Sequence, residues 1–185
     1  GCNLGCKFCA TASLKLTRNL SPGEIVDQFL QAERYSPKKI TNIVFMGMGE
    51  PMNNYDNVMK AAEIFNDQRN DMVAPRRTTL STAGVVPGII RMADEERIIK
   101  LAVSLHATTQ GTREQLMPIA RKFRLTELMD AIEYYYRKTR KSITYEYILF
   151  DGVNDTEDDV KRLAKIARRI PDPRLDRDVT GRAAG

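Results

Sequence analysis

Apolar and polar positions along this chain recur with two periods, one typical of helices and the other of buried strands. Helical spacing predicts amphipathic helices, and short apolar runs rich in β-branched residues predict strands of a parallel sheet. Ser21-Pro22-Gly23-Glu24 is a capping box with proline at the first helical position, which marks where the first helix begins. The expected helices lie near 22–36, 58–65, 86–95, 128–135 and 160–167, and the expected strands near 40–46, 78–82, 98–105 and 143–149.

The order of these segments predicts an α/β fold. A loop with three cysteines comes first, then one helix, then four strand–helix units, and such alternation favours parallel strands joined by right-handed crossovers. A barrel or open barrel suits this order, and a doubly wound sheet is the rival arrangement. Because a closed barrel needs more strands, we expect one before Cys2 and at least one after Ile170 to lie outside this sequence, which begins in mid-motif without methionine.

The domain assignment follows from composition. Residues 1–170 carry all the predicted elements and form one incomplete barrel core, whereas 171–185 are rich in Pro, Asp and Arg and predict a poorly structured tail.

The 185 residues are 42% hydrophobic and 29% charged, and no apolar run is long enough for a membrane helix. The formal net charge of +5 favours a polyanion such as RNA as a partner. Small basic groups at 38–39, 76–77, 121–122 and 137–141 permit RNA binding but are equally typical of solvated faces.

All three cysteines, Cys2, Cys6 and Cys9, lie in the first nine residues with the spacing C-x3-C-x2-C. An odd, tightly clustered set argues against disulfides and for a metal or cluster site in a reducing compartment, so we expect a cytoplasmic protein. Three thiolates on one short loop can hold three irons of a [4Fe-4S] cube. The fourth iron is then open to a chelating ligand, such as the amino and carboxylate groups of methionine or S-adenosylmethionine (SAM). Phe8 can shield one face of the cube from water.

Other uses of the cysteines stay open at this point. The same thiolates could bind zinc with His106, the single histidine, as a fourth ligand. Closed zinc sites usually take their ligands as two close pairs, and His106 lies far along the chain, so the usual pattern is absent. A cluster that only carries electrons and inert cysteines are further alternatives.

Three segments extend the cysteine motif to a longer pattern: TNIVFMGMGEP at 41–51, LSTAGVVP at 80–87 and VSLHA at 103–107. The C-x3-C-x2-C motif with an aromatic residue before its third cysteine resembles the radical SAM superfamily. With the three segments in order, the chain from Gly1 to about Ile170 resembles the RlmN family of dual-specificity RNA methyltransferases. The related Cfr enzymes, which methylate C8 of the same adenine, share much of the pattern and are the nearest alternative.

The resemblance implies a partial (β/α)6 TIM-like barrel, here without at least its first and last strands. It implies methyl transfer to C2 of an adenine in 23S rRNA and of an adenine beside the anticodon in tRNA, through a 5′-deoxyadenosyl radical generated from SAM at a [4Fe-4S] cluster. Flavodoxin or ferredoxin would supply the electron, and the enzyme would be a monomer. The implied metal ligands are Cys2, Cys6 and Cys9, and the implied SAM-binding residues are Gly49, Glu50, Ser81, Ser104, Leu105 and His106.

The physical properties of these SAM-binding candidates agree with the resemblance. Each follows or ends a predicted strand, where barrel enzymes collect their active-site residues. Glu50 can accept a hydrogen bond from the SAM ammonium, and Gly49 permits close approach of the backbone. Taken one at a time, however, the Gly-Glu-Pro sequence also suits a plain turn, a serine at a strand end also suits a helix cap, and a single histidine also suits the core.

The resemblance also implies two catalytic cysteines, one of which carries a methyl group. All three cysteines of this sequence belong to the cluster motif, so that pair would lie outside it, and we expect these 185 residues alone not to methylate RNA. Two other classes remain: a radical SAM activase or synthase acting on proteins or small molecules, and a non-enzymatic zinc- or RNA-binding module.

Overall fold

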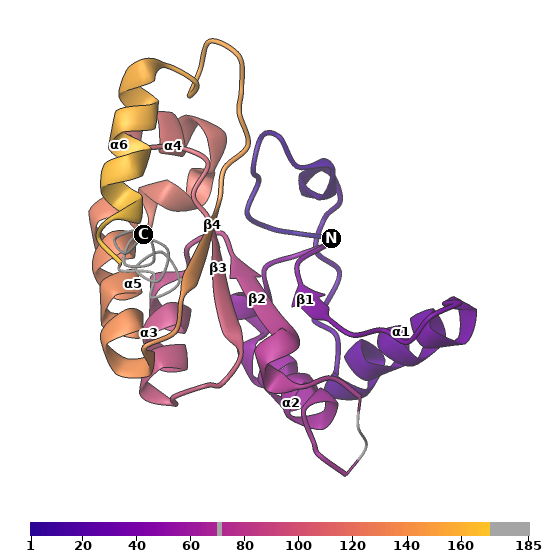
Figure 1. Cartoon of the computed structure of the whole chain (residues 1–185). Coiled ribbons are helices and arrows are strands. Elements are labelled where there is room, and N and C mark those ends of the chain that lie inside the picture. Colours follow the sequence, from indigo (N-terminus) through magenta and orange to yellow (C-terminus); the bar gives the residue numbers. More distant parts are fainter. Residues whose placement is uncertain (70–71, 171–185) are drawn as a thin grey trace, which may run out of the picture.

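The computed structural model describes residues 1–69 and 72–170, and its centre is a four-stranded sheet (Figure 1). The strands are β1 (Ile43–Phe45), β2 (Thr78–Thr82), β3 (Lys100–Ser104) and β4 (Ile143–Glu146). All pairs are parallel, and the spatial order β1-β2-β3-β4 follows the sequence. A doubly wound sheet reverses its strand order at a switch point, so the sequential order of the described strands excludes that arrangement and fits an open barrel.

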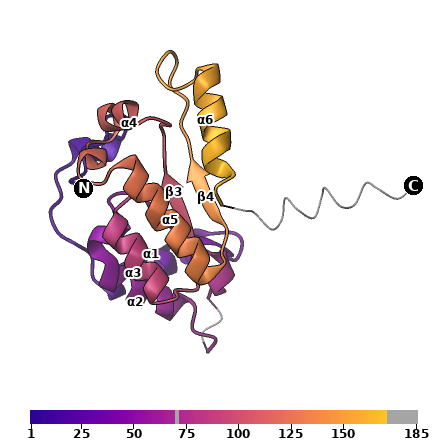
Figure 2. The ribbon, with the colours of Figure 1, turned by 90° about the vertical axis from the view of Figure 1, so that its left-hand side faces the viewer.

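Helices cover the sheet and fill the crossovers between its strands. They are α1 (Pro22–Tyr35), α2 (Tyr55–Phe65), α3 (Val86–Asp94), α4 (Gln110–Leu116), α5 (Leu125–Thr139) and α6 (Glu157–Ala167). Figure 2 shows α3 and α5 side by side against one face of the sheet, with α6 next to β4. Short 3₁₀ helices lie at Ala10–Ser13, Pro51–Asn54, Pro75–Arg77 and Pro118–Arg121. No helix in the described part of the chain has the length and apolar character that crossing a membrane requires.

The predicted start of α1 is confirmed by its capping box. The Ser21 hydroxyl accepts a hydrogen bond from the Glu24 main-chain N–H, and the Glu24 carboxylate accepts one from the Ser21 N–H at 2.9 Å. The two bonds satisfy N–H groups that a helix N-terminus otherwise leaves without partners, and Pro22 has none to satisfy.

The main hydrophobic core lies between the sheet and the helices α3 and α5. Alternate residues of β3, among them Leu101 and Val103, are fully buried there against Ile89, Leu128 and Ile132. Full burial of each such side chain stabilises the fold by about 1.5–3 kcal/mol. A second cluster formed by Phe29, Ala61, Phe65 and Val73 fixes α1 and α2 on the β1 side. Together these clusters hold the strand ends, and the loops that follow them, in fixed relative positions.

Some element boundaries differ from those expected. β1 is shorter than predicted, and it is not buried: Val44 is 56% exposed. The reason is that β1 is the edge strand of the described sheet. β4 ends at Glu146 because its partner β3 ends at Ser104. The residues that follow bond instead to two side chains, Asn154 of their own loop and His106 of the loop after β3. Helix α4 was not predicted. The expected tail, 171–185, lies outside the described residues.

Candidate functional site

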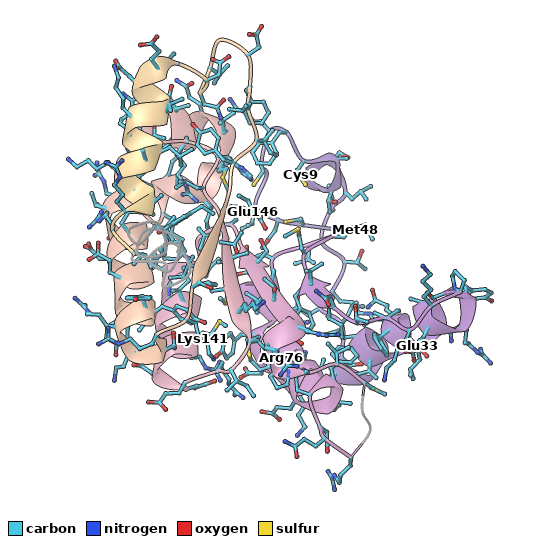
Figure 3. The ribbon with its side chains drawn as sticks, in the orientation of Figure 1. Cys9, Glu33, Met48, Arg76, Lys141 and Glu146 are labelled. Atoms are coloured by element: carbon cyan, nitrogen blue, oxygen red, sulfur yellow. The ribbon has the colours of Figure 1, made fainter. Side chains whose placement is uncertain are left out.

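The predicted site residues lie at the carboxyl end of the parallel sheet. In Figure 3, Cys9, Met48 and Glu146 mark this end, whereas Arg76 and Lys141 lie at the opposite end. Because parallel strands end on one side, the loops after β1, β2, β3 and β4 meet the cysteine loop there. The basic groups 76–77 and 137–141 are therefore remote from the cysteines and do not line the site.

Backbone hydrogen bonds anchor the cysteine loop at both ends and in the middle. Cys2 N–H donates to Leu14 C=O at 3.2 Å, Lys7 N–H donates to Leu116 C=O at 2.9 Å, and Cys9 N–H donates to Cys6 C=O at 3.2 Å. The three thiols are free and half-buried. The loop is thus held on the end of α4, with its three cysteines only partly buried.

Phe8 connects the cysteine loop to the loops after β3 and β4. Its ring meets the His106 ring edge-on, with centroids 4.9 Å apart and planes at 85°, and it also packs against Phe150 at 5.4 Å. Such aromatic contacts exclude water from one side of the loop. Phe8, His106 and Phe150 thus form an aromatic wall on one side of the cysteine loop, which suits the shielding role expected of Phe8.

Glu50 is almost completely buried after β1, and the main chain binds its carboxylate. Oε1 accepts from Met52 N–H at 3.0 Å, and Oε2 accepts from Ala83 N–H, beyond β2, at 2.7 Å. Burial raises the pKa of Glu50, and these two N–H groups oppose the rise. Gly49 has φ of 116°, which favours glycine, and a Cβ there would lie 3.4 Å from Gly1 C=O. Gly49 thus lets the β1 loop approach the start of the cysteine loop.

Ser81 and Ser104 share a partner that the sequence did not reveal. The Glu146 carboxylate, at the end of β4, accepts hydrogen bonds from the Ser81 hydroxyl at 3.1 Å and from the Ser104 hydroxyl at 2.8 Å through the same oxygen. Glu146 therefore joins three strand ends. Glu146 ends the observed strand β4, but the predicted strand ran on to residue 149 and placed Glu146 in its middle, so no sequence pattern indicated its position.

His106 is buried after β3 in a left-handed conformation, with φ of 52°. Nδ1 accepts from Ile148 N–H at 3.1 Å, and burial lowers the pKa of His106, so the ring is neutral and carries its proton on Nε2. Asn154, also missed from sequence, donates through Nδ2 to His106 C=O and Ile148 C=O, each at 2.8 Å. The β4 loop thereby fixes the orientation of the histidine.

Leu105 differs from the other candidates because its side chain belongs to the hydrophobic core. Its N–H donates to Glu146 C=O at 3.0 Å, and its C=O accepts from Arg113 Nε at 3.3 Å.

A cavity of about 570 Å³ opens between the cysteine loop, α1 and β1, lined in part by Cys2, Gly49 and Glu50. It does not include Ser81, Ser104 or His106, so the candidates lie in two neighbouring groups.

The Radical SAM superfamily model matches residues 1–165. The chain belongs to this superfamily. It is 47% identical over 175 residues to a probable dual-specificity RNA methyltransferase RlmN of Flavobacterium psychrophilum, covering 92% of this chain and 50% of that protein. The same name is given to a Thermotoga neapolitana protein that is 48% identical over 170 residues, with 92% and 50% covered. The chain thus spans about half the length of these curated relatives.

A crystal structure of a radical SAM methyltransferase from Sphaerobacter thermophilus has the same fold. Its TM-score is 0.86 at 42% sequence identity, over 92% of this chain and 51% of that one. The expected partial barrel of the radical SAM type is therefore confirmed. Members of this superfamily use a [4Fe-4S] cluster and SAM, which confirms the cofactors expected from sequence.

The donor set of the cysteine loop, three free thiols with C-x3-C-x2-C spacing, suits an iron–sulfur cluster. In residues 1–69 and 72–170, no three His, Cys, Asp or Glu side chains converge as one ion requires. A cube binds its thiolates through three different irons, so they need not converge on one point. Burial, followed by the nearby Cys2 and Cys9, raises the pKa of the Cys6 thiol to about 11. Cluster binding must therefore displace a proton from Cys6.

Proposed function

We propose that this chain is the radical-generating part of an RNA methyltransferase of the RlmN type, with Cys2, Cys6 and Cys9 as the cluster ligands. Support comes from the placement of three free, half-buried thiols on one anchored loop beside the strand-end polar groups. That single observation carries the proposal, because a site-differentiated cluster needs three cysteines and an adjoining site for its chelating ligand. When bound, the cluster supplies the electron that cleaves SAM.

In this proposal the strand-end residues bind and orient SAM. Two main-chain N–H groups and the Thr82 hydroxyl donate to the Glu50 carboxylate, which keeps an acceptor site for an ammonium group, while Gly49 allows the ligand to approach the backbone. Ser81, Ser104 and Glu146 offer a carboxylate and two hydroxyls to ribose or amino groups. His106 presents Nε2–H as a donor to the adenosyl part, and Leu105 contributes through its main chain.

The proposed reaction is methyl transfer to C2 of adenine in 23S rRNA and, beside the anticodon, in tRNA. Adenine C2 is an electron-poor carbon, so direct displacement on the SAM methyl group is unfavourable there and radical chemistry is needed. The names of the relatives support an RNA substrate. We further propose that the whole enzyme uses a methylated cysteine outside this sequence, takes its electron from flavodoxin or ferredoxin, and acts as a cytoplasmic monomer.

Production of 5′-deoxyadenosine tests the radical function. Anaerobically reconstituted protein, given SAM and dithionite, should form 5′-deoxyadenosine and methionine, measured by liquid chromatography. Cys6→Ala should abolish the product, whereas Ser13→Ala, an exposed change in the same N-terminal region, should preserve it. Iron-loaded wild-type protein that leaves SAM intact, or Cys6→Ala with wild-type turnover, would contradict the proposal.

The site of methylation needs the full-length protein. Nucleoside analysis of RNA treated with it should show 2-methyladenosine, whereas 8-methyladenosine would indicate the Cfr-type alternative. The 185 residues alone should give neither product.

A further inference from the structure

Arg113 is a buried cation on α4, the helix whose end holds the cysteine loop. The last residue of α4, Leu116, accepts the Lys7 N–H at 2.9 Å, and Pro118 lies 3.9 Å from the Cβ position of Gly5. The side chain of Arg113 is completely inaccessible to water. Arginine is almost never fully buried unless a partner compensates its charge.

The hydrogen bonds of Arg113 bring it no opposite charge. Nη2 donates to Ala83 C=O at 2.7 Å and to Ser104 C=O at 3.3 Å, and Nε donates to Leu105 C=O at 3.3 Å. These acceptors are neutral carbonyl groups at the carboxyl ends of β2 and β3. Nη1 is buried and has no acceptor within the described part of the chain.

The cysteine loop is the neighbour from which a compensating charge can come, because α4 holds that loop through the Lys7–Leu116 bond. Burial lowers the pKa of Arg113 to about 10, the neighbouring Cys6 opposes this shift, and at neutral pH the guanidinium stays charged. An unpaired buried charge is strongly destabilising. An anionic group on the cysteine loop would remove that cost, and three thiolates around an iron–sulfur cube are such a group.

We propose that Arg113 is the fixed countercharge of the iron–sulfur cluster, held by the carbonyls of Ala83, Ser104 and Leu105 so that its charge favours the reduced cluster. This inference rests on the proposed assignment of Cys2, Cys6 and Cys9 as ligands. Reduction adds one electron, and hence one negative charge, to the cluster without breaking a bond. A nearby positive charge stabilises that product more than the oxidised form, so it raises the reduction potential.

Two substitutions separate charge from packing. Arg113→Gln removes the charge and keeps hydrogen-bond donors, whereas Arg113→Lys keeps the charge. Arg97→Gln is the matched control, because Arg97 pairs with Glu63 and Glu95 near the amino end of β3, remote from the cysteines. Each protein is reconstituted anaerobically and titrated with dithionite, the electron source, while electron paramagnetic resonance follows the reduced cluster. Iron content and circular dichroism are measured on the same samples.

Arg113→Gln should lower the equilibrium constant for reduction at least tenfold, which is about 59 mV for a one-electron couple. Arg113→Lys and Arg97→Gln should shift it less than that. If Arg113→Gln cannot hold iron while Arg113→Lys can, the requirement for charge is also supported. The proposal is overturned if iron-loaded Arg113→Gln keeps the wild-type reduction potential, even if its affinity for SAM falls. It is also overturned if both Arg113 variants stay folded but bind no iron. Wild-type protein without iron would instead refute the cysteine assignment itself.

Discussion

The two ends of the parallel sheet differ in how they use polar side chains. At the amino end, Arg91 and Arg97 pair at the surface with carboxylates such as Glu63 and Glu95. At the carboxyl end, Glu50, His106 and Asn154 are buried, and each is bonded to a different loop. Surface ion pairs contribute about 0–1 kcal/mol, whereas buried polar groups are costly unless every bond is made. The carboxyl end is thus built for rigid placement of functional groups.

The largest effect is expected from the buried amide of Asn154. Asn154→Ala leaves His106 C=O, Ile148 C=O and Phe150 N–H without their partner. The free energy of unfolding should fall by about 3 kcal/mol, measured by urea denaturation, because each buried unsatisfied group costs about 1–3 kcal/mol. Asn57→Ala, which removes one side-chain bond to Asn54, should cost less than about 1 kcal/mol. Equal losses in the two variants would contradict the larger cost assigned to the buried amide of Asn154.

Glu146 should affect ligand binding more than stability. Glu146→Ala removes the shared acceptor of Ser81 and Ser104, so the dissociation constant for SAM should rise at least tenfold, or about 1.4 kcal/mol, by isothermal titration calorimetry. Glu133→Ala removes a half-exposed carboxylate paired with Arg169 and should leave SAM binding unchanged. Similar affinities for wild type and Glu146→Ala would place SAM elsewhere.

Asp159 makes the carboxyl end sensitive to acid. Hydrogen bonds from Thr108, Thr156 and Arg162 hold the pKa of Asp159 well below its ordinary value of about 3.9. The stabilisation is therefore complete above about pH 4 and is lost as the pH falls towards the folded-state pKa. Asp159→Asn should be about 1–2 kcal/mol less stable at pH 7. Its deficit in urea denaturation should shrink at pH 3, and a deficit independent of pH would contradict the linkage.

The smallest effect is expected at the amino end. Arg91→Gln removes ion pairs with Asp56 and Glu95, yet it should cost less than about 1 kcal/mol, because Arg91 and Asp56 are well exposed. Added salt should lower the free energy of unfolding of the wild type towards that of the variant, because salt screens exposed ion pairs. A loss as large as that of Asn154→Ala would show that the surface pairs also determine stability.

The sequence predicted the parts of this molecule that depend on local pattern. Apolar periodicity located the strands β2 and β3 and the helix α1, and the spacing of Cys2, Cys6 and Cys9 indicated their chemistry. Glu146, Arg113 and Asn154 were missed because their importance depends on partners far along the chain. Arg113, for example, bonds to carbonyls at Ala83 and Leu105, and an arginine in a polar stretch gives no sign of being buried.

Exposure of the edge strand was also beyond the sequence pattern. The run from 40 to 46 has the composition of a buried strand, yet Val44 is more than half exposed, because the described sheet has no strand on that side of β1. Periodicity describes which residues can be buried, whereas the neighbouring strands determine which of them are.

The central claim is that three thiolates on one loop bind an iron–sulfur cube and leave one iron open. Quantifying iron, sulfide and zinc in the protein after anaerobic reconstitution tests it most directly. We predict about four irons and four sulfides per chain for the wild type, and loss of both for Cys2→Ala, Cys6→Ala or Cys9→Ala. One zinc per chain, with neither iron nor sulfide, would contradict the account.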